Sequence, residues 1–192
     1  MTQPLLVPTP GQTVGPFFGF ALPYPGGEQL VPADHPDAVR LTGRVLDGQG
    51  DPVPDALLEI WQADPAGRAV VAGGSLHRDG HTFTGWGRAA TDVTARYTFT
   101  TLLPGPTAPG RAPFIAMAVF ARGLLNRLFT RVYIPRADGA EDVWQSDPLL
   151  AGLDADRRAT LVAERDGAVL HFDVRLQGER ETVFLRYPGH AQ

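Results

Sequence analysis

The sequence lacks two reactive residue types altogether, because it contains no cysteine and no lysine. The absence of cysteine excludes disulfides, thiol nucleophiles and thiolate metal sites, and the absence of lysine excludes Schiff-base and lysine-base mechanisms. All 17 basic residues are therefore arginine. Arginine binds carboxylates and phosphates through two parallel hydrogen bonds, so a ligand bound by charge is expected to carry one of these groups. Codon bias explains most of these arginines equally well.

Long apolar runs and an excess of charge are also missing. No run approaches the roughly 20 apolar residues that span a bilayer. A net charge of -4 and a pI near 5.7 argue against a dedicated nucleic-acid or anionic-membrane binder. The first residues, MTQPLLVPTPGQT, lack the charged start and apolar stretch of a signal peptide, so a cytoplasmic location is expected. A length of 192 residues fits one domain with a hydrophobic core.

Few side chains could act as nucleophiles or metal ligands. The two serines are not in a G-x-S-x-G elbow, and no phosphate-binding loop is present. His77 and His81 are four residues apart, which suits a metal site on a helix, but the Asp-Gly between them favours a solvent-exposed turn. His171 and Asp173 have the spacing of part of a facial iron triad, with His190 as the third ligand. The alternative for that pair is an exposed strand face.

The 22 glycines and 18 prolines separate short apolar runs, as is typical of an all-β domain. Apolar and polar residues alternate within several runs, which predicts strands with one buried face. One short helix is predicted near 154–164, because Asp154 is a favourable N-cap. This pattern predicts a β-sandwich with long loops. An extended N-terminal arm, 1–38, is expected before a single domain at 39–192. The predicted strands are 39–46, 56–63, 96–103, 114–121, 127–134, 169–176 and 181–187.

Two short segments are candidates for binding. Arg122 follows one apolar strand and precedes another, so it lies in a connection at one end of a sheet and could present its guanidinium to a carboxylate. The alternative is a solvated loop arginine. In the arm, Gly15 and Pro16 stiffen the chain and allow close approach of a ligand to the backbone. The alternative there is a plain linker, anchored by Phe17 and the phenylalanines that follow it.

Several sequence motifs of this chain occur together in one known family. They are TPGQTVGPFF at 9–18, LTGRVLDGQGDPVPDALLEIWQADPAGR at 41–68, GWGRAATD at 85–92, RAPFIAMAVFARGLLNRLFTRVYIP at 111–135 and FDVRLQGERETVFL at 172–185. In these motifs the chain resembles the intradiol ring-cleaving dioxygenases, and in particular the alpha-type chains of their protocatechuate-cleaving members. The resemblance covers nearly the full length and implies a β-sandwich.

The same resemblance implies that the metal ligands of the family are replaced here. Iron-bearing chains read like FRTIKPGPYPW and RPAHIHF, where this chain reads FTTLLPGPTAP and RAPFIAM. Thr107 and Ala69 stand at the positions of two ligand tyrosines. Phe114 and Ala116 stand at the positions of two ligand histidines. None of these side chains can bind iron in the family's way, so this chain is expected to hold no metal.

The resemblance further implies a partner. In such hetero-oligomers the beta subunit holds Fe(III), and O2-dependent cleavage converts protocatechuate to 3-carboxy-cis,cis-muconate in aromatic catabolism. Arg122 would face the substrate carboxylate, while Gly15 and Pro16 would line the cavity. Phe17 stands where related alpha chains often have tyrosine, so a hydroxyl is lost there while aromatic packing can remain. The isolated chain is expected to be inactive. The alternative is a non-catalytic β-sandwich module that stabilises a partner chain without touching substrate.

Overall fold

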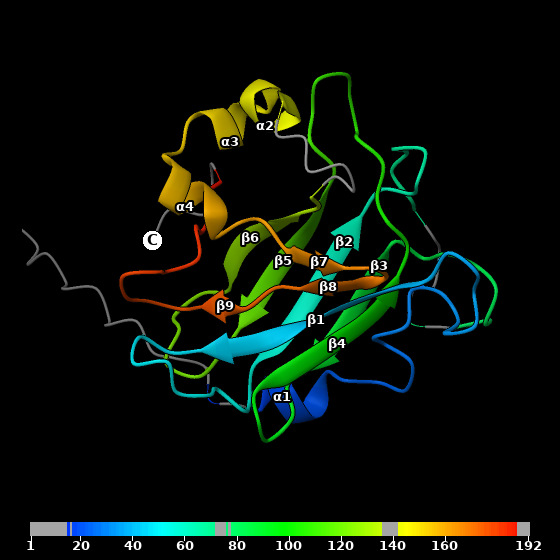
Figure 1. Ribbon diagram of the computed structural model, residues 1–192. Coiled ribbons are helices and arrows are strands. Elements are labelled where there is room, and N and C mark those ends of the chain that lie inside the picture. The colour runs from blue at the N-terminus through cyan, green and yellow to red at the C-terminus, as the bar shows by residue number, and fades with distance from the viewer. Residues whose placement is uncertain (1–14, 16, 72–75, 77, 136–141, 188–192) are drawn as a thin grey trace, which may run out of the picture.

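The computed structural model describes residues 15, 17–71, 76, 78–135 and 142–187. Two β-sheets face each other in a sandwich, with three short helices at one end (Figure 1). The first sheet contains β1 (Val39–Leu46), β4 (Arg96–Thr101), β7 (Glu164–Asp166), β8 (Val169–His171) and β9 (Val174–Arg175). The second contains β2 (Leu57–Gln62), β3 (Trp86–Ala90), β5 (Phe114–Phe120) and β6 (Leu128–Tyr133), in the order β3-β2-β5-β6. The prediction of a mainly β sandwich is therefore confirmed.

The alternation of apolar residues explains how the sheets bury a common core. On β5, Ile115, Met117 and Val119 are buried, whereas the residues between them are half-buried on the outer face. Successive side chains of a strand point to opposite faces, so the four outer positions of β5 form a line on the outside of the second sheet. The inner positions meet large buried side chains of the other sheet, among them Tyr97 and Phe99.

Three helices follow β6: α2 (Asp142–Ser146), α3 (Pro148–Ala151) and α4 (Ala155–Ala159). Asp154 caps α4 as predicted, because its side chain accepts a hydrogen bond from the Arg157 amide at 2.8 Å. The helix is shorter than the predicted range 154–164. The residues that follow the helix pair with β6 instead of continuing the helix. The Tyr133 amide donates to the Leu161 carbonyl, and the Ala163 amide donates to the Tyr133 carbonyl. No helix among the described residues has the length and hydropathy to cross a membrane.

The last predicted strands differ from the structure. The range 169–176 is divided into β8 and β9, which pair with different parts of β1. At the break, the Asp173 side chain accepts a hydrogen bond from the Arg44 amide at 2.8 Å, so a side chain replaces a backbone partner there. The range 181–187 is not a strand, apart from one bridge between Leu185 and Phe129. Strand β3 was not predicted, because its glycine and alanines give no apolar alternation.

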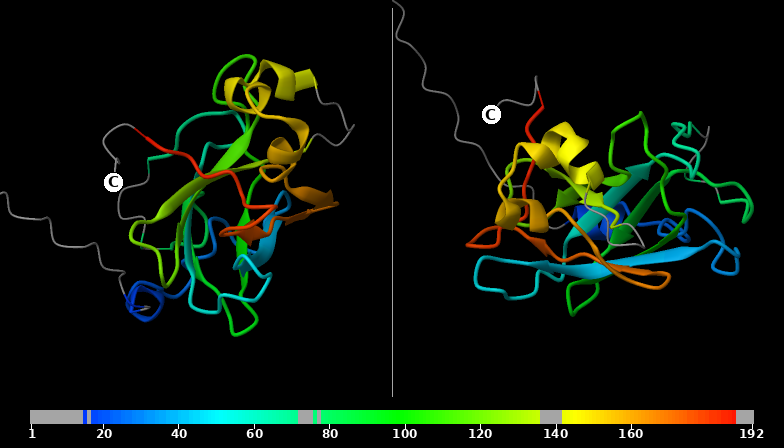
Figure 2. Two further views of the ribbon diagram at one scale, coloured as in Figure 1. Left: turned by 90° about the vertical axis from the view of Figure 1, so that its left-hand side faces the viewer. Right: turned by 45° about the horizontal axis from the view of Figure 1, so that its top comes forward.

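The N-terminal segment is more folded than the extended arm that the sequence predicts. Helix α1 (Phe18–Ala21) lies against the sandwich at the end opposite to α2 and α3 (Figure 1). Further along, Leu30 and Val31 are buried, and the Leu30 amide donates to the Thr100 carbonyl of β4 at 2.8 Å. Leu30 thus lies between Gly87 of β3 and Thr100 of β4. The two turned views show the two sheets of the sandwich from other sides (Figure 2). The domain boundary at 38/39 stays a prediction.

Candidate functional site

Strand β5 connects the two regions that the sequence singles out. Phe114 and Ala116 lie at its start on the outer face, and Arg122 follows its last residue, Phe120, by two positions. Six residue steps of β5 separate Phe114 from Phe120, which corresponds to roughly 20 Å, and Arg122 lies in the turn beyond that end. The replaced ligand positions and the candidate arginine therefore occupy opposite ends of the same strand.

At the start of β5, a cation is already present on the outer face. Ala116 pairs with Trp61 of β2 and with Arg131 of β6 in the sheet register. The guanidinium of Arg131 lies over the Phe114 ring, with its Cζ 4.1 Å from the ring centre. Its Nη1 also donates a hydrogen bond to the Tyr133 hydroxyl at 3.1 Å. Arg131 therefore covers Phe114, the side chain that the resemblance sets at the position of a ligand histidine.

Tyr133 is held as a neutral hydroxyl beneath this arginine. Its ring packs against Phe114, with centres 5.7 Å apart, and its hydroxyl donates to Asp147 Oδ1 at 3.2 Å. Burial raises the pKa of Tyr133 to about 12, although the nearby Arg131 acts in the opposite direction. Asp147 is fully buried and also accepts the Ala112 amide and the first amides of α3. The Tyr133 hydroxyl therefore takes part in a structural hydrogen-bond network as a neutral phenol and does not act as a tyrosinate ligand.

Two loops carry the remaining replaced positions, Ala69 and Thr107. The Gly105 amide donates to the Asp64 carbonyl at 2.9 Å, and a Cβ on Gly67 would collide with the Pro106 carbonyl oxygen. The loops therefore touch backbone to backbone, which requires glycine at both contacts. Thr107 is exposed, and Ala69 forms a bridge with Ala63.

The residues at this end do not fit Fe(III). Alanine, threonine and phenylalanine at the four mapped positions offer no ionised or imidazole ligand, and Arg131 contributes a positive charge. Among the residues that the structure describes, no group of three histidine, aspartate or glutamate side chains could hold a metal.

The structure gives no support to the two metal sites that the histidine spacings suggested. His171 and Asp173 are exposed, and His190 lies outside the described residues, as does His77. His81 is exposed in a turn whose amides donate to the Asp79 side chain, as the sequence predicts for that loop.

At the other end of β5, Arg122 forms an ion pair with Asp55. Its Nε lies 2.9 Å from Oδ2 and 3.1 Å from Oδ1 of that carboxylate. The arginine side chain is 60% exposed, whereas the aspartate side chain is 14% exposed. A partly buried carboxylate therefore holds the Nε edge of an exposed guanidinium. No hydrogen bond within the described residues engages the two terminal nitrogens, so they can bind a second carboxylate.

Helix α1 places the N-terminal arm next to Asp55, the partner of Arg122. Phe18 is buried, and its ring centre lies 6.2 Å from that of Phe120. A Cβ on Gly19 would lie 3.4 Å from the carbonyl oxygen of Asp55, so the helix passes in contact with the residue that pairs with Arg122. Phe17 precedes the helix and is exposed. The structure thus brings Arg122 and the arm segment close together, which their separation in sequence did not indicate.

The other two candidate residues of the arm are Gly15 and Pro16. Gly15 is exposed, and its carbonyl accepts the Phe17 amide at 2.8 Å. Pro16 lies outside the described residues. Asp55 was missed by the sequence analysis, and no local signal marks it.

Comparisons with known proteins agree with this architecture. The model of the family described as Dioxygenase matches residues 14–178. The chain belongs to this dioxygenase family. It is 42% identical to the protocatechuate 3,4-dioxygenase alpha chain of Burkholderia cepacia, over 92% of this chain and 96% of that one. The corresponding alpha chain of Pseudomonas putida is 37% identical, over 95% and 98%.

A beta chain is also similar, at a lower level. The protocatechuate 3,4-dioxygenase beta chain of Burkholderia cepacia is 31% identical, over 85% of this chain and 80% of that one. Among solved structures, the dioxygenase domain of a carbohydrate-binding fusion from Streptomyces sp. SirexAA-E has a TM-score of 0.57 and 26% identity, covering 90% of this chain and 99% of that domain. The membership of the intradiol dioxygenases that the resemblance implied is confirmed.

Proposed function

We propose that this chain is the alpha subunit of a protocatechuate 3,4-dioxygenase and acts together with a beta-type chain. In that complex, protocatechuate is cleaved with O2 between its hydroxyl-bearing carbons to 3-carboxy-cis,cis-muconate. The similarity to two alpha chains over almost their whole length supports this assignment. The similarity to a beta chain supports a partner of the same fold.

The observation that carries the proposal is the separation of the two ends of β5. The six residue steps of β5 between Phe114 and Phe120 span roughly 20 Å. Arg122 lies beyond Phe120 and the arm packs against Phe120, so neither is placed to serve a reaction centre at the Phe114 end of this chain. Their exposure instead suits a site completed by another chain. The partner would hold the Fe(III), which activates the bound catechol ring toward O2.

The contribution of this chain is to bind and orient substrate. Asp55 holds the Nε edge of Arg122, and the terminal nitrogens then meet the carboxylate of protocatechuate in a fork. Gly15, Pro16 and Phe17 would form a wall of the cavity. A hydrogen bond to a charged group contributes about 1.5–3 kcal/mol, and holding the ring in one orientation favours reaction at one bond.

The test is Arg122→Ala in the purified complex with a beta-type chain. KM for protocatechuate should rise about 10- to 150-fold, which corresponds to the loss of one charge-assisted contact. KM for catechol, which has no carboxylate, should change much less. Arg40 of β1 is exposed on the other sheet, and Arg40→Ala serves as the matched control.

Equal effects of Arg122→Ala on the two substrates would remove Arg122 from this role. If Arg122→Ala changed neither KM while the complex stayed assembled and active, the non-catalytic module would be the better description. Stoichiometric iron bound by the isolated wild-type chain would contradict the assignment of the metal to the partner.

A further inference from the structure

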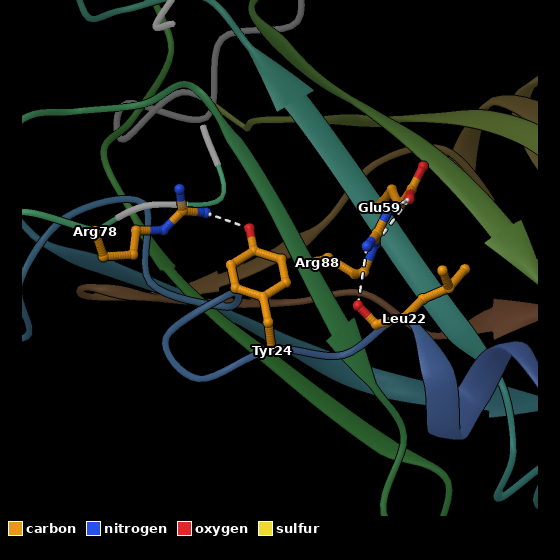
Figure 3. A network of polar contacts seen from close by, with 5 residues as sticks. All are labelled: Leu22, Tyr24, Glu59, Arg78 and Arg88. Carbon is orange, nitrogen blue, oxygen red and sulfur yellow. Dashed lines mark hydrogen bonds and ion pairs between the residues drawn. The ribbon is translucent and has the colours of Figure 1, made fainter. Parts of the chain in front are cut away.

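A second arginine, Arg88 of β3, joins the arm to the second sheet. Its Nε and Nη2 donate to Glu59 Oε1 at 2.9 and 2.6 Å, and its Nη1 donates to the Leu22 carbonyl at 2.9 Å. Figure 3 shows the guanidinium between Glu59 on β2 and the backbone at the end of α1. The side chains of Arg88 and Glu59 are only 16% and 22% exposed, so water competes weakly for these bonds.

The same region holds the arm at a second point. The Arg88 amide donates to the Gly27 carbonyl at 2.8 Å. The Tyr24 ring stacks on Trp86, with planes 7° apart, and its hydroxyl accepts a hydrogen bond from Arg78 Nη2 at 3.0 Å (Figure 3). The chain from Leu22 to Gly27 is therefore attached to β3 at both ends.

Backbone hydrogen bonds transmit this attachment to the substrate-facing segment. Leu22 is the C-cap of α1, and its amide donates to the Phe18 carbonyl at 3.1 Å. The Ala21 amide donates to the Phe17 carbonyl at 2.9 Å, and the Phe17 amide donates to Gly15. A helix of one turn has little stability of its own. Its position therefore depends on the anchors at its ends and on the packing of Phe18.

We propose that Arg88 is a positioning residue that fixes α1, and with it Gly15 and Phe17, beside Arg122. This inference rests on the proposed function, because it concerns the same substrate cavity. Glu59 aims the guanidinium by binding two of its nitrogens, and the third nitrogen then holds the Leu22 carbonyl. The role requires a fork that reaches two acceptors in fixed directions. Lysine, with a single ammonium group, does not reproduce that geometry.

The experiment compares Arg88→Lys and Arg88→Leu in the complex with a beta-type chain. Loss of the anchor lowers the fraction of complexes with the arm in place, and apparent affinity falls by that fraction. Both variants should raise KM about tenfold, with kcat changed less than about twofold. The increase should be similar for protocatechuate and catechol, because the proposed cavity wall of Gly15 and Phe17 would face the ring that both substrates share. Arg40→Leu is the matched control and should leave both KM values unchanged.

Two further measurements separate positioning from general stabilisation. Arg88→Lys should keep a Tm near that of the wild type, since the ammonium can still pair with Glu59, whereas Arg88→Leu should lower it. In hydrogen exchange, the amides of Phe20, Ala21 and Leu22 should exchange about tenfold faster in both variants, while the amides of β5 should keep their protection.

The inference is overturned if Arg88→Lys has the KM of the wild type, because KM would then follow stability rather than the fork. It is also overturned if the α1 amides keep their protection in both variants. Failure of the proposed function would appear elsewhere, as equal responses of the two substrates to Arg122→Ala.

Discussion

The most demanding prediction concerns the four positions that the resemblance assigns to metal ligands, because placing the family's ligand types there should not produce strong iron binding. The change is Ala69→Tyr, Thr107→Tyr, Phe114→His and Ala116→His in one chain, which recreates the ligand types of the family. We expect this variant to bind iron poorly, because Arg131 remains over position 114.

The magnitude follows from the position of the guanidinium. A metal bound to a histidine at position 114 would lie in the ring plane, about 3 Å from the ring centre, since metal–nitrogen bonds are about 2 Å long. Arg131 Cζ lies 4.1 Å from that centre over the ring face, so the metal and Cζ would be about 5 Å apart. With two tyrosinates the iron site has a net charge of about +1, and an effective dielectric of about 20 gives a repulsion of about 3 kcal/mol. This energy lowers affinity about a hundredfold.

The assay compares this variant with a second one that also carries Arg131→Gln. Both are loaded with ferric iron and desalted, and iron per chain and the tyrosinate-to-iron absorption band are measured against iron concentration. Arg40→Gln in place of Arg131→Gln is the control for loss of one arginine. Equal iron affinity with and without Arg131 would refute the argument. Failure of both variants to bind iron, with the fold intact by circular dichroism, would show that the four positions are not the former ligand set.

Two further predictions concern the network under Arg131. Asp147→Ala should lower the free energy of unfolding by about 3 kcal/mol in urea titrations, because it removes a helix cap and leaves the proton of the Tyr133 hydroxyl without an acceptor. Asp147→Asn keeps an acceptor and should cost much less, and equal losses would contradict this account. The pKa of Tyr133, raised to about 12 from an ordinary 10.0, means that the unfolded chain loses this proton first, so its contribution to stability is complete below pH 10 and is lost as pH rises toward 12. Tyr133→Phe should flatten the fall of stability in that range, and an unchanged slope would show that another group causes it.

The sequence predicts the strands best where burial alone decides the structure. Strand β1 has the predicted bounds, and β2, β5 and β6 differ by one or two residues, because their inner positions alternate over a single core. The prediction fails where another element supplies the hydrogen-bond partners. Leu161 and Ala163 continue a helical pattern, but their backbone groups pair with Tyr133 of β6. Apolar and polar residues alternate well over 169–176, yet the strand is interrupted after β8. There the Asp173 side chain accepts the hydrogen bond of the Arg44 amide in place of a backbone carbonyl.

The sequence names candidate site residues, which stay a prediction, but it does not show which groups hold them. Arg122 follows from its place after an apolar strand, whereas its partner Asp55 is 67 residues away. Arg88 lies 66 residues from Leu22, whose carbonyl it binds. An arginine in a strand and an aspartate in a loop have no local pattern that shows which groups they meet, since tertiary packing determines those pairs.

The two ends of β5 differ in how their polar side chains are held. At the Phe114 end, removal of ligands would leave an outer face with unfilled space and unpaired polar groups, which is costly unless other side chains take their place. Phe114, Arg131, Tyr133 and Asp147 fill that requirement with ring contacts and hydrogen bonds, so this end contributes stability. At the other end, the exposed Arg122 is held by only one carboxylate. Sites this far apart without shared partners vary nearly independently, so substitutions at the Phe114 end are expected to leave the Arg122 end undisturbed.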